Sequence, residues 1–290
     1  MSAARVSVVV PVYNGEATIG DCVESIFALA FPRDDLELLL IDNASSDRTP
    51  AIIDRYRDRA VILHEIKRGP AAARNRGLLH ATGDIVAFTD ADCVVDRDWL
   101  IRLIAPLSDP VVGIVGGTIL ARTPCNAVEE FGERIHDHRM AIECYSPPYA
   151  ITMNWASRRS VLEEVGPFDE DLLRCEDCDL AYRVVAAGDR IVHEPAAVVY
   201  HRNERSLVGL ITEGYAHGYH SIRLLKKHEE FVRTFVTSSP PRNGRATAEW
   251  SANHALYWRV FNFGKAAGKM IGSIRQQSLT YRSGGGSKRE

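Results

Sequence analysis

Residues 5–12 read RVSVVVPV and residues 36–42 read LELLLID, and the segment between them, residues 18–29, reads TIGDCVESIFAL. The two outer segments are apolar at most positions, which is typical of strands buried on both faces of a sheet. The middle segment repeats apolar residues at helical spacing from Ile19 to Phe27. This order of strand, helix and strand predicts the start of a mostly parallel sheet.

The same alternation continues through residue 89. A helix is predicted over 49–56 (TPAIIDRY), a strand over 61–66 (VILHEI), a helix over 70–83 (PAAARNRGLLHATG) and a strand over 85–89 (IVAFT). Apolar strands separated by helices imply an α/β fold, with a mostly parallel sheet that carries helices on both faces.

The pattern beyond residue 110 is less regular and indicates a second part of the chain. We expect strands over 111–120, 149–159, 190–194 and 196–201, and helices over 126–143, 159–166, 176–188 and 206–230. These elements predict one domain over 1–205 and a helical extension over 206–282. Within the extension, TSSPPRNG at 237–244 is the candidate linker, and the Gly- and Ser-rich tail, 283–290, is expected to be disordered.

The charge of the chain is unevenly distributed. The net charge of 290 residues is −3, but residues 223–290 hold 13 Lys and Arg against 4 Asp and Glu, a net of +9. The remaining residues hold 22 against 34, a net of −12. No run of about 18 apolar residues predicts a membrane span, so any membrane contact is expected at the surface.

The six cysteines are scattered, and no apolar signal segment precedes the first predicted strand. This use of cysteine favours a protein with reduced thiols in the cytoplasm. Such a protein would be dissolved there or bound at the inner face of the membrane. Cys175 and Cys178 have the spacing of a zinc or redox pair, although no second matching pair follows and both cysteines flank acids.

Polar residues follow the predicted strands. In open α/β sheets, ligands bind outside the carboxyl ends of the strands. We therefore expect a ligand site near Asp42, at the end of the second predicted strand, and near Asp90 and Asp92, which follow the fourth. Two carboxylates at this spacing can hold Mg²⁺ or Mn²⁺. An isolated Asp-x-Asp can equally be a solvated turn or a helix cap.

Four motifs, in a fixed order along the chain, make the functional prediction specific. VSVVVPVYNGEATIGDCVESI, LLLIDNASSDRT, GPAAARNRGLLHATGDIVAFTDADCVVDRDWL and VGPFDEDLLRCEDCDLAYRVVAAG follow one another within residues 5–202. Their order and spacing resemble family 2 glycosyltransferases of the GT-A fold, which are inverting enzymes that use nucleotide sugars. The resemblance implies a GT-A Rossmann-like sheet with a C-terminal helical extension.

The resemblance also implies a site for a nucleotide diphosphate sugar. Its residues would be Pro11, Val12, Tyr13, Glu16, Asp42, Arg74, Asn75, Asp90 and Ala91. An aromatic ring at position 13 can stack on a base, a carboxylate at position 42 can accept hydrogen bonds from the base or ribose, and a guanidinium at position 74 can offset phosphate charge.

The metal and the general base are implied in the same way. Asp92 matches the direct ligand of Mn²⁺ or Mg²⁺, with Asp90 nearer the ribose or the water shell of the metal, and His201 matches a further ligand in some members. Asp177, preceded by Glu176, matches the catalytic base. The family's Gln-x-x-Arg-Trp signature of long-chain polymerases is absent from the sequence, which favours transfer of a single sugar.

The acceptor side is less defined. Tyr145, Asn154 and Trp155 are candidate pocket residues. His136 and His138 are expected at the surface, while His217 and His220 could line the acceptor side. The acceptor would be lipid-linked or a polysaccharide, and no nucleic acid partner is expected. The basic amphipathic segment 250–277 could contact an anionic membrane, or pack on the main domain or on a second subunit as a homodimer.

Two other functions remain open from the sequence. The Asp-x-Asp pair also occurs in phosphohydrolases, in which the first aspartate is the nucleophile. A nucleotide-sugar-binding scaffold without activity would need only the binding residues. An NAD site is disfavoured because PVYNGE lacks the G-x-G-x-x-G pattern after the first strand.

Overall fold

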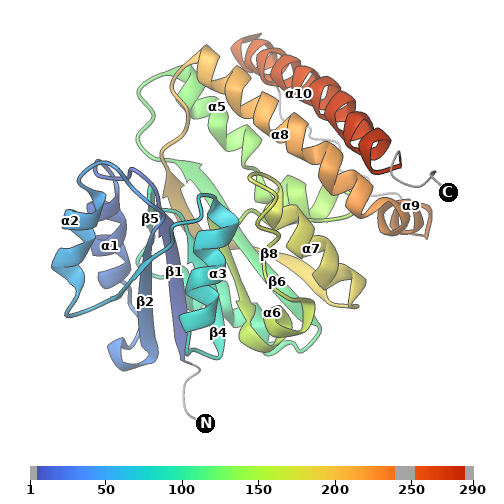
Figure 1. Ribbon diagram of the computed structural model, residues 1–290. Helices are drawn as coiled ribbons and strands as arrows, with labels where there is room; N and C mark the ends of the chain where they lie inside the picture. The colour runs from blue at the N-terminus through green and yellow to red at the C-terminus, as the bar shows by residue number, and fades with distance from the viewer. Residues whose placement is uncertain (1–4, 239–251, 285–290) are drawn as a thin grey trace.

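A computed structural model describes residues 5–238 and 252–284, with the side chains of 238, 252–254 and 277–284 excepted. One eight-stranded sheet has the order β3-β2-β1-β4-β7-β6-β8-β5 (Figure 1). Its first half is parallel and consists of β1 (Val6–Val12), β2 (Leu36–Asp42), β3 (Val61–His64) and β4 (Ile85–Thr89).

The second half of the sheet is mixed. It contains β5 (Cys93–Val95), β6 (Val112–Ala121), β7 (Asn154–Arg158) and β8 (Arg190–His201). Strand β7 runs antiparallel to both β4 and β6, and β5 is antiparallel to β8, while β6 and β8 are parallel. The predicted α/β fold is confirmed, and the parallel part of the sheet comprises chiefly its first four strands.

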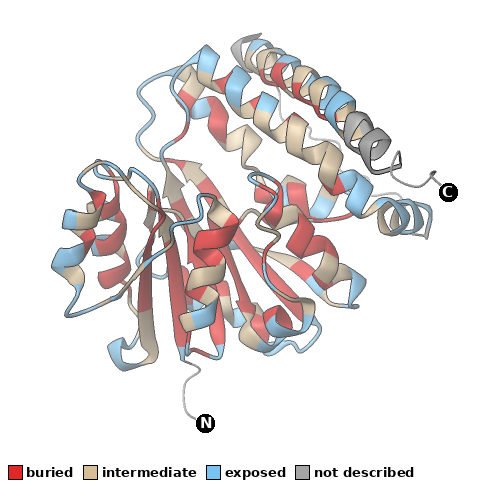
Figure 2. Cartoon of the chain, in the orientation of Figure 1, coloured by how far each residue is buried: buried red, intermediate tan, exposed pale blue. Residues whose placement is uncertain are grey.

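Helices cover both faces of the sheet, and β1 shows why. Val8 and Val10 pack into one apolar cluster, and Val9 packs into the other. The first cluster is closed by α1 (Ile19–Phe27), α2 (Thr49–Ile53) and α4 (Trp99–Ile104), and the second by α3 (Pro70–His80), α6 (Arg159–Val165) and α7 (Glu176–Ala186). A fully buried Val side chain stabilises the fold by about 1.5–3 kcal/mol, so a strand that is apolar at consecutive positions is held from both sides. Figure 2 shows the resulting concentration of buried residues in the sheet.

The remaining helices form a separate layer at one end of the sheet (Figure 1). They are α5 (Ala127–Ile135), α8 (Leu207–Lys227), α9 (Glu229–Ser238) and α10 (Ala252–Gly284). A π-helical turn (Met140–Cys144) instead packs on the sheet through Ile142. Helix α10 runs along α8 so closely that a Cβ atom on Gly218 would lie 2.0 Å from the carbonyl oxygen of Lys265. None of the helices in residues 5–238 and 252–284 combines the length and the apolar composition that a bilayer crossing requires.

Several boundaries differ from the sequence-based prediction. The helix predicted over 126–143 ends at Ile135, and a separate π-helical turn follows at Met140–Cys144. The strand predicted over 149–159 covers only Asn154–Arg158. The two short strands predicted over 190–194 and 196–201 are one strand, β8, whose ladder with β6 passes from Glu194 to Val198 across an irregularity. Of the candidate linker 237–244, residues 237–238 end α9 and the remainder lies outside the described residues. Most of the predicted tail, 285–290, also lies outside them, and the division into 1–205 and 206–282 stays a prediction.

Candidate functional site

The carboxyl ends of β1, β2 and β3 lie side by side. Val12 is in register with Asp42, and Asp42 is in register with His64. Strand β4 is parallel to β1 and ends at Thr89, directly before Asp90. The topology therefore brings the polar residues that follow these strands to one edge of the sheet, where ligands of α/β proteins bind.

Tyr13 and Asp42 lie at this edge in different environments. The Tyr13 side chain is exposed, and the Arg68 guanidinium carbon lies 5.0 Å from the centre of its ring. Asp42 is only 5% exposed, its Oδ1 accepts a hydrogen bond of 3.3 Å from the backbone N–H of Ser45, and its Oδ2 lies 3.5 Å from Nδ1 of His64. An accessible ring beside an oriented carboxylate is a suitable arrangement for a nucleoside.

The neighbouring positions hold the loops in place. Glu16 Oε2 accepts hydrogen bonds from the backbone N–H and the Nε of Arg48, at 3.0 and 3.2 Å, and so joins the loop after β1 to the loop after β2. The side chains of Val12 and Ala91 are buried, and that of Pro11 is half-buried. Val12 and Ala91 therefore present mainly their backbone to the edge of the sheet.

Arg74 connects the Asp-x-Asp motif to the Glu-Asp motif. Its guanidinium, on α3, is almost completely buried and donates to Asp90 Oδ1 at 2.9 Å and to Glu176 Oε1 at 2.6 Å. Two carboxylates converge on one buried cation, which is the arrangement that makes such a cluster tolerable in the interior. The segments after β4 and at the start of α7 are thereby held next to each other.

Asn75 has a structural role in these contacts. Its Nδ2 donates to the Phe168 carbonyl at 3.0 Å and to Glu170 Oε1 at 2.9 Å, and its Oδ1 accepts from the Phe168 N–H at 2.8 Å. The side chain predicted to lie near the nucleotide is thus engaged with the loop that leads into α7. Asn75 positions that loop.

Asp92 and His201 face each other across the end of β8. Asp92 Oδ2 lies 3.4 Å from His201 Nε2, and His201 Nδ1 lies 2.6 Å from Asn203 Oδ1. Burial alone would lower the pKa of His201, but the hydrogen bond and the charge of Asp92 raise it to about 9. The reverse holds for Asp92, where burial raises the pKa and His201 lowers it more, for a net lowering. A carboxylate and an imidazole whose ring is oriented by the Asn203 amide form a donor set that suits Mn²⁺.

Asp177 lies on the first turn of α7, directly after Glu176. Its Oδ1 accepts a hydrogen bond of 2.8 Å from the backbone N–H of Cys178. Burial raises the pKa of Asp177 most, the negative charges of Glu176 and Cys175 add to the effect, and the pKa reaches about 7. A half-buried carboxyl group with this pKa can exchange a proton near neutral pH.

The next acid along the helix, Asp179, has a structural role. It is completely buried and accepts from Arg183 at 2.9 Å, from Lys227 at 2.6 Å and from His228 at 2.8 Å. Burial opposes ionisation, but His228 and Lys227 lower the pKa of Asp179 to about 2. This carboxylate ties α7 to the end of α8, so the Glu-Asp motif stands on a fixed turn.

Helix α8 contributes Glu213, which the sequence analysis did not assign to the site, and His217. Glu213 Oε1 lies 3.4 Å from His136 Nε2 and 4.0 Å from His217 Nε2, and the His136 ring lies edge-on to His201 at 5.1 Å. Glu213 and His217 are four residues apart on one helix face, and that spacing is the signal by which the sequence could have identified them.

The predicted surface location of His136 and His138 is wrong. His136 is mostly shielded beside Glu213, and His138 is 1% exposed, with its Nδ1 2.6 Å from the Gly117 carbonyl. Burial lowers the pKa of His138 to about 3. His138 is therefore a neutral structural residue between β6 and the segment before β7.

Two of the three acceptor candidates also require correction. Asn154 is completely buried, with Nδ2 donating to the carbonyls of Thr118 and Ala197 and Oδ1 accepting from Trp99 Nε1. Trp155 is 1% exposed and packs on Phe88 in the interior. Neither side chain reaches the surface, so neither borders an acceptor pocket in this structure.

Tyr145 differs from them. It is 46% exposed at the end of the π-helical turn, with its ring 5.8 Å from that of Tyr149. Its role toward an acceptor stays a prediction.

The hypothesis that Cys175 and Cys178 bind zinc requires further ligands, which the described residues do not supply. Within residues 5–238 and 252–284, no three His, Cys, Asp or Glu side chains are grouped to hold a metal ion on their own. Cys175 and Cys178 thus lack the additional protein ligands of a structural zinc site in the described part of the chain. Asp92 and His201 likewise supply two donors, and a cation there would complete its shell with water and phosphate oxygens.

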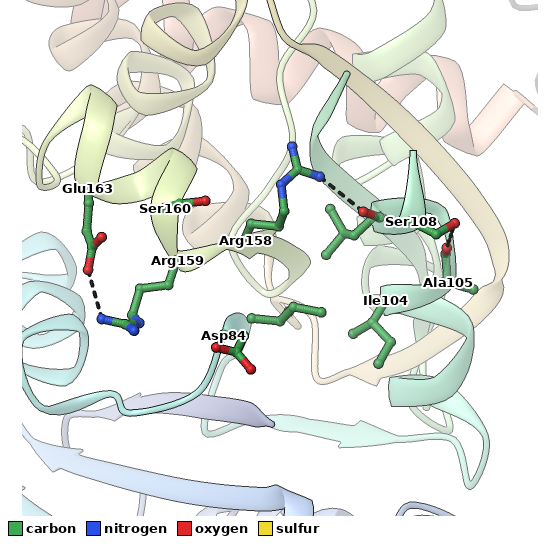
Figure 3. A pocket seen from close by; sticks show the side chains of 10 residues that line it. Asp84, Ile104, Ala105, Ser108, Arg158, Arg159, Ser160 and Glu163 are labelled. Carbon is green, nitrogen blue, oxygen red and sulfur yellow. Dashed lines mark hydrogen bonds and ion pairs between the residues drawn. The ribbon is translucent and has the colours of Figure 1, made fainter. Parts of the chain in front are cut away.

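A cavity of about 560 Å³ lies beside the amino end of β4, at the opposite end of the parallel strands from the candidate site (Figure 3). Its two arginines are engaged within the protein. Arg158 donates to the carbonyls of Leu107 and Pro110, and Arg159 donates to Gly83 and Glu163. The cavity is separate from the strand ends where the predicted site residues gather.

Comparison with known proteins points to one family. Residues 7–166 match the model of glycosyl transferase family 2. The chain is 31% identical over 189 residues to glycosyltransferase AglE of Haloferax volcanii, and 30% identical over 248 residues to the pre-mycofactocin glycosyltransferase of Mycobacterium tuberculosis. These matches cover 63% and 80% of this chain, but 62% and 50% of the two relatives, so the chain spans only part of their length.

A solved structure agrees with the sequence matches. The mannosyltransferase of Pyrobaculum calidifontis, in complex with GDP-Man and Mn²⁺, superposes with a TM-score of 0.64 at 25% identity, covering 98% of this chain and 76% of that one. The family model spans more than half of the chain and includes the strand ends, the Asp-x-Asp motif and β7. The chain therefore belongs to glycosyl transferase family 2.

Proposed function

We propose that the protein transfers one sugar from a nucleotide diphosphate sugar to an acceptor hydroxyl with inversion, with a divalent cation at Asp92 and Asp177 as general base. The observation that carries this proposal is the connection made by Arg74, which hydrogen-bonds Asp90 of the Asp-x-Asp motif and Glu176 of the Glu-Asp motif. A donor held at the strand ends would have its reacting end between the two motifs.

The nucleotide would be bound at the ends of β1 and β2. Tyr13 offers an accessible ring, and Asp42 offers a carboxylate whose position is fixed by the Ser45 N–H. GDP-Man, the ligand of the Pyrobaculum calidifontis structure, is a donor of this class.

The cation would be held by Asp92 and His201, with Asp90 supporting the donor beside it. When bound, Mn²⁺ or Mg²⁺ would act as a Lewis acid that offsets the charge on the departing diphosphate. His201 fits this role because Nδ1 is directed to Asn203, which leaves Nε2 on the side of Asp92. The Asp92 side chain is 42% exposed, which leaves room for phosphate and water ligands.

Asp177 would take the proton from the acceptor. As the acceptor oxygen bonds to the anomeric carbon, its proton passes to the Asp177 carboxylate, and the bond to the nucleoside diphosphate breaks with both electrons leaving on the diphosphate. This single displacement inverts the anomeric carbon and forms no covalent enzyme intermediate. The raised pKa of Asp177 makes it a better proton acceptor than an ordinary carboxylate.

The acceptor side is proposed to lie under α8 and near a membrane surface. Helix α10 carries the exposed apolar residues Leu256, Phe263, Met270 and Ile274, and its residues 252–284 contain basic but no acidic side chains. An apolar stripe among cations suits an anionic bilayer, where a lipid-linked acceptor would reside. A second copy of the same cationic helix would be repelled. Salt-sensitive pelleting with anionic vesicles tests this part, and the absence of pelleting would reject it.

Calorimetry tests the donor site. UDP, GDP, dTDP and their sugars are titrated with Mn²⁺ and with EDTA, using wild type, Asp92→Ala and the exposed control Asp98→Ala. We expect one nucleotide to bind about tenfold or more tighter with Mn²⁺, because the cation adds charge-assisted contacts to the diphosphate. Asp92→Ala should lose this difference, and Asp98→Ala should keep it.

The same protein is then assayed for slow hydrolysis of the preferred donor. Metal-dependent hydrolysis supports the transferase. A phosphorylated aspartate would instead support a phosphohydrolase, and tight binding without hydrolysis or transfer would support a scaffold. Equal affinity in Mn²⁺ and EDTA would contradict the proposed metal site.

A further inference from the structure

Two free cysteines bracket the Glu-Asp motif. Cys175 is the N-cap of α7, with a left-handed φ of 67°, and its carbonyl accepts the first helical hydrogen bond from Asp179 at 3.0 Å. Cys178 lies three residues later, on the same face of the first turn. The sequence Cys-Glu-Asp-Cys thus encloses the proposed base between two thiols.

The two thiols belong to one apolar cluster. Cys178 packs against the cluster of buried residues that contains Cys175 and Tyr182. Cys175 is buried beside Leu172 and Leu224, and its Sγ lies 4.0 Å from the His217 carbonyl. Cysteines three residues apart on the first turn of a helix have their Cβ atoms about 5–6 Å apart, and a disulfide bond joins residues whose Cα atoms are about that far apart.

The surroundings give the two thiols different reactivities. The neighbouring Cys178 thiol lowers the pKa of Cys175 most, burial opposes it, and His217 assists, so that the pKa reaches about 6. The neighbouring Cys175 sulfur, together with burial, raises the pKa of Cys178 well above the ordinary value. A low-pKa thiolate at a helix N-terminus beside a second thiol is the pattern of an attacking and a resolving cysteine.

We propose that Cys175 and Cys178 form a redox-active dithiol, and that hydrogen peroxide oxidises it to a disulfide that suppresses transfer by displacing Asp177. The effect on transfer rests on the proposed function, whereas the formation of the disulfide does not.

The oxidation proceeds in two steps. The Cys175 thiolate attacks one peroxide oxygen, the O–O bond breaks, and hydroxide leaves and is protonated to water, which gives a sulfenic acid on Cys175. The Cys178 sulfur then attacks the Cys175 sulfur, the S–O bond breaks, and the departing hydroxide takes the Cys178 proton as a second water. The two thiols lose two electrons, and these reduce one peroxide to two waters.

The disulfide would alter the site in two ways. Drawing the two sulfurs together to about 2.05 Å shifts the first turn of α7, on which Asp177 lies. It also removes the thiolate charge that helps to raise the pKa of Asp177. A displacement of about 1 Å at a catalytic group can lower a rate by about a hundredfold.

Mass spectrometry can detect the modification directly. Trypsin cleaves after Arg174 and Arg183, so one nine-residue peptide, CEDCDLAYR, contains both cysteines. The full chain is treated with peroxide, its remaining thiols are alkylated, and the protein is digested. The peptide from wild type should lose two hydrogen atoms and take up no alkylating agent, while transfer falls about tenfold or more. Dithiothreitol should reverse both changes.

Matched variants isolate the pair. Replacing Cys125 and Cys144 with Ser, in one protein, should leave the response unchanged, because neither belongs to α7. Cys175→Ser should keep its own untreated rate in peroxide. If Cys175→Ser does not fold, Cys178→Ser replaces it, and its peptide should carry a sulfenic acid that dimedone traps on Cys175.

Two outcomes would overturn the proposal. One is a fully alkylated peptide after peroxide treatment has lowered the rate, and the other is a complete disulfide with an unchanged rate. The mass of the peptide can be measured whether or not the protein transfers sugar. If the untreated protein shows no transfer, the proposed function is contradicted, but the formation of the disulfide can still be measured.

Discussion

Arg74 Nη1 donates a hydrogen bond of 2.6 Å to Glu176 Oε1, although 102 residues separate the two in the sequence. Both side chains are almost completely buried, and Arg74 also binds Asp90. Removing one partner of such a cluster leaves charge in the interior without compensation. The contact therefore affects the stability of the fold as well as the site.

Arg74→Met should destabilise the protein by about 3–5 kcal/mol, because Asp90 and Glu176 lose their shared cation. Urea denaturation at neutral pH measures the free energy of unfolding. Arg57→Met is the matched control, since Arg57 pairs with Asp54 on the exposed surface and should have almost no effect. Equal free energies of unfolding for the two variants would show that the buried cluster does not stabilise the fold.

Gly218→Ala should destabilise the helical layer by about 1–3 kcal/mol, because the added methyl group would overlap the Lys265 carbonyl and force α8 and α10 apart. Gly20→Ala is the control within α1, where an added Cβ meets nothing within 4 Å. Thermal unfolding of both variants makes the comparison. A Gly218→Ala protein as stable as Gly20→Ala would argue against the close packing of α8 on α10.

The rate of transfer should depend on pH through Asp177. The base is active when ionised, and its pKa is about 7, so kcat/KM should rise with pH below about 7 and level off above it. Glu176→Gln removes a charge that raises this pKa, and the rise should move to lower pH. Glu163→Gln, an exposed acid on α6, should leave the profile in place. A profile that is flat between pH 5 and 8 in wild type would contradict a base with this pKa.

Much of the fold could be predicted from the sequence, because its first four strands are apolar on both faces and alternate with helices. β1 illustrates this, since Val8, Val9 and Val10 fill two clusters. The second half was harder to predict because its strands pair out of chain order. Strand β7 lies between β4 and β6, and this central position buries Asn154 and Trp155, which local composition placed at a pocket.

The candidate site was predictable where residues follow parallel strands, as Asp42, Asp90 and Asp92 do. Contacts from elements distant in the sequence were not. Glu213 reaches His136 from α8, and Arg74 reaches Glu176 from α3. Such pairs depend on how helices dock on the sheet, which hydrophobic periodicity alone does not specify.

Asp177→Asn tests the central claim most directly, because it separates catalysis from folding. Asp177 has a pKa of about 7 in the folded protein, against an ordinary value in the unfolded chain. The folded state therefore binds the extra proton, and the stability of wild type should fall as pH rises from about 4 to 7. The neutral Asn side chain avoids this cost.

The measurement is transfer and urea denaturation at pH 8 on wild type and Asp177→Asn side by side. We expect the variant to lose transfer by about a thousandfold while it gains stability on the order of 2–4 kcal/mol, a gain that vanishes below about pH 4. Donor binding in Mn²⁺ should remain. Transfer by Asp177→Asn at the rate of wild type would contradict the assignment of Asp177 as the general base.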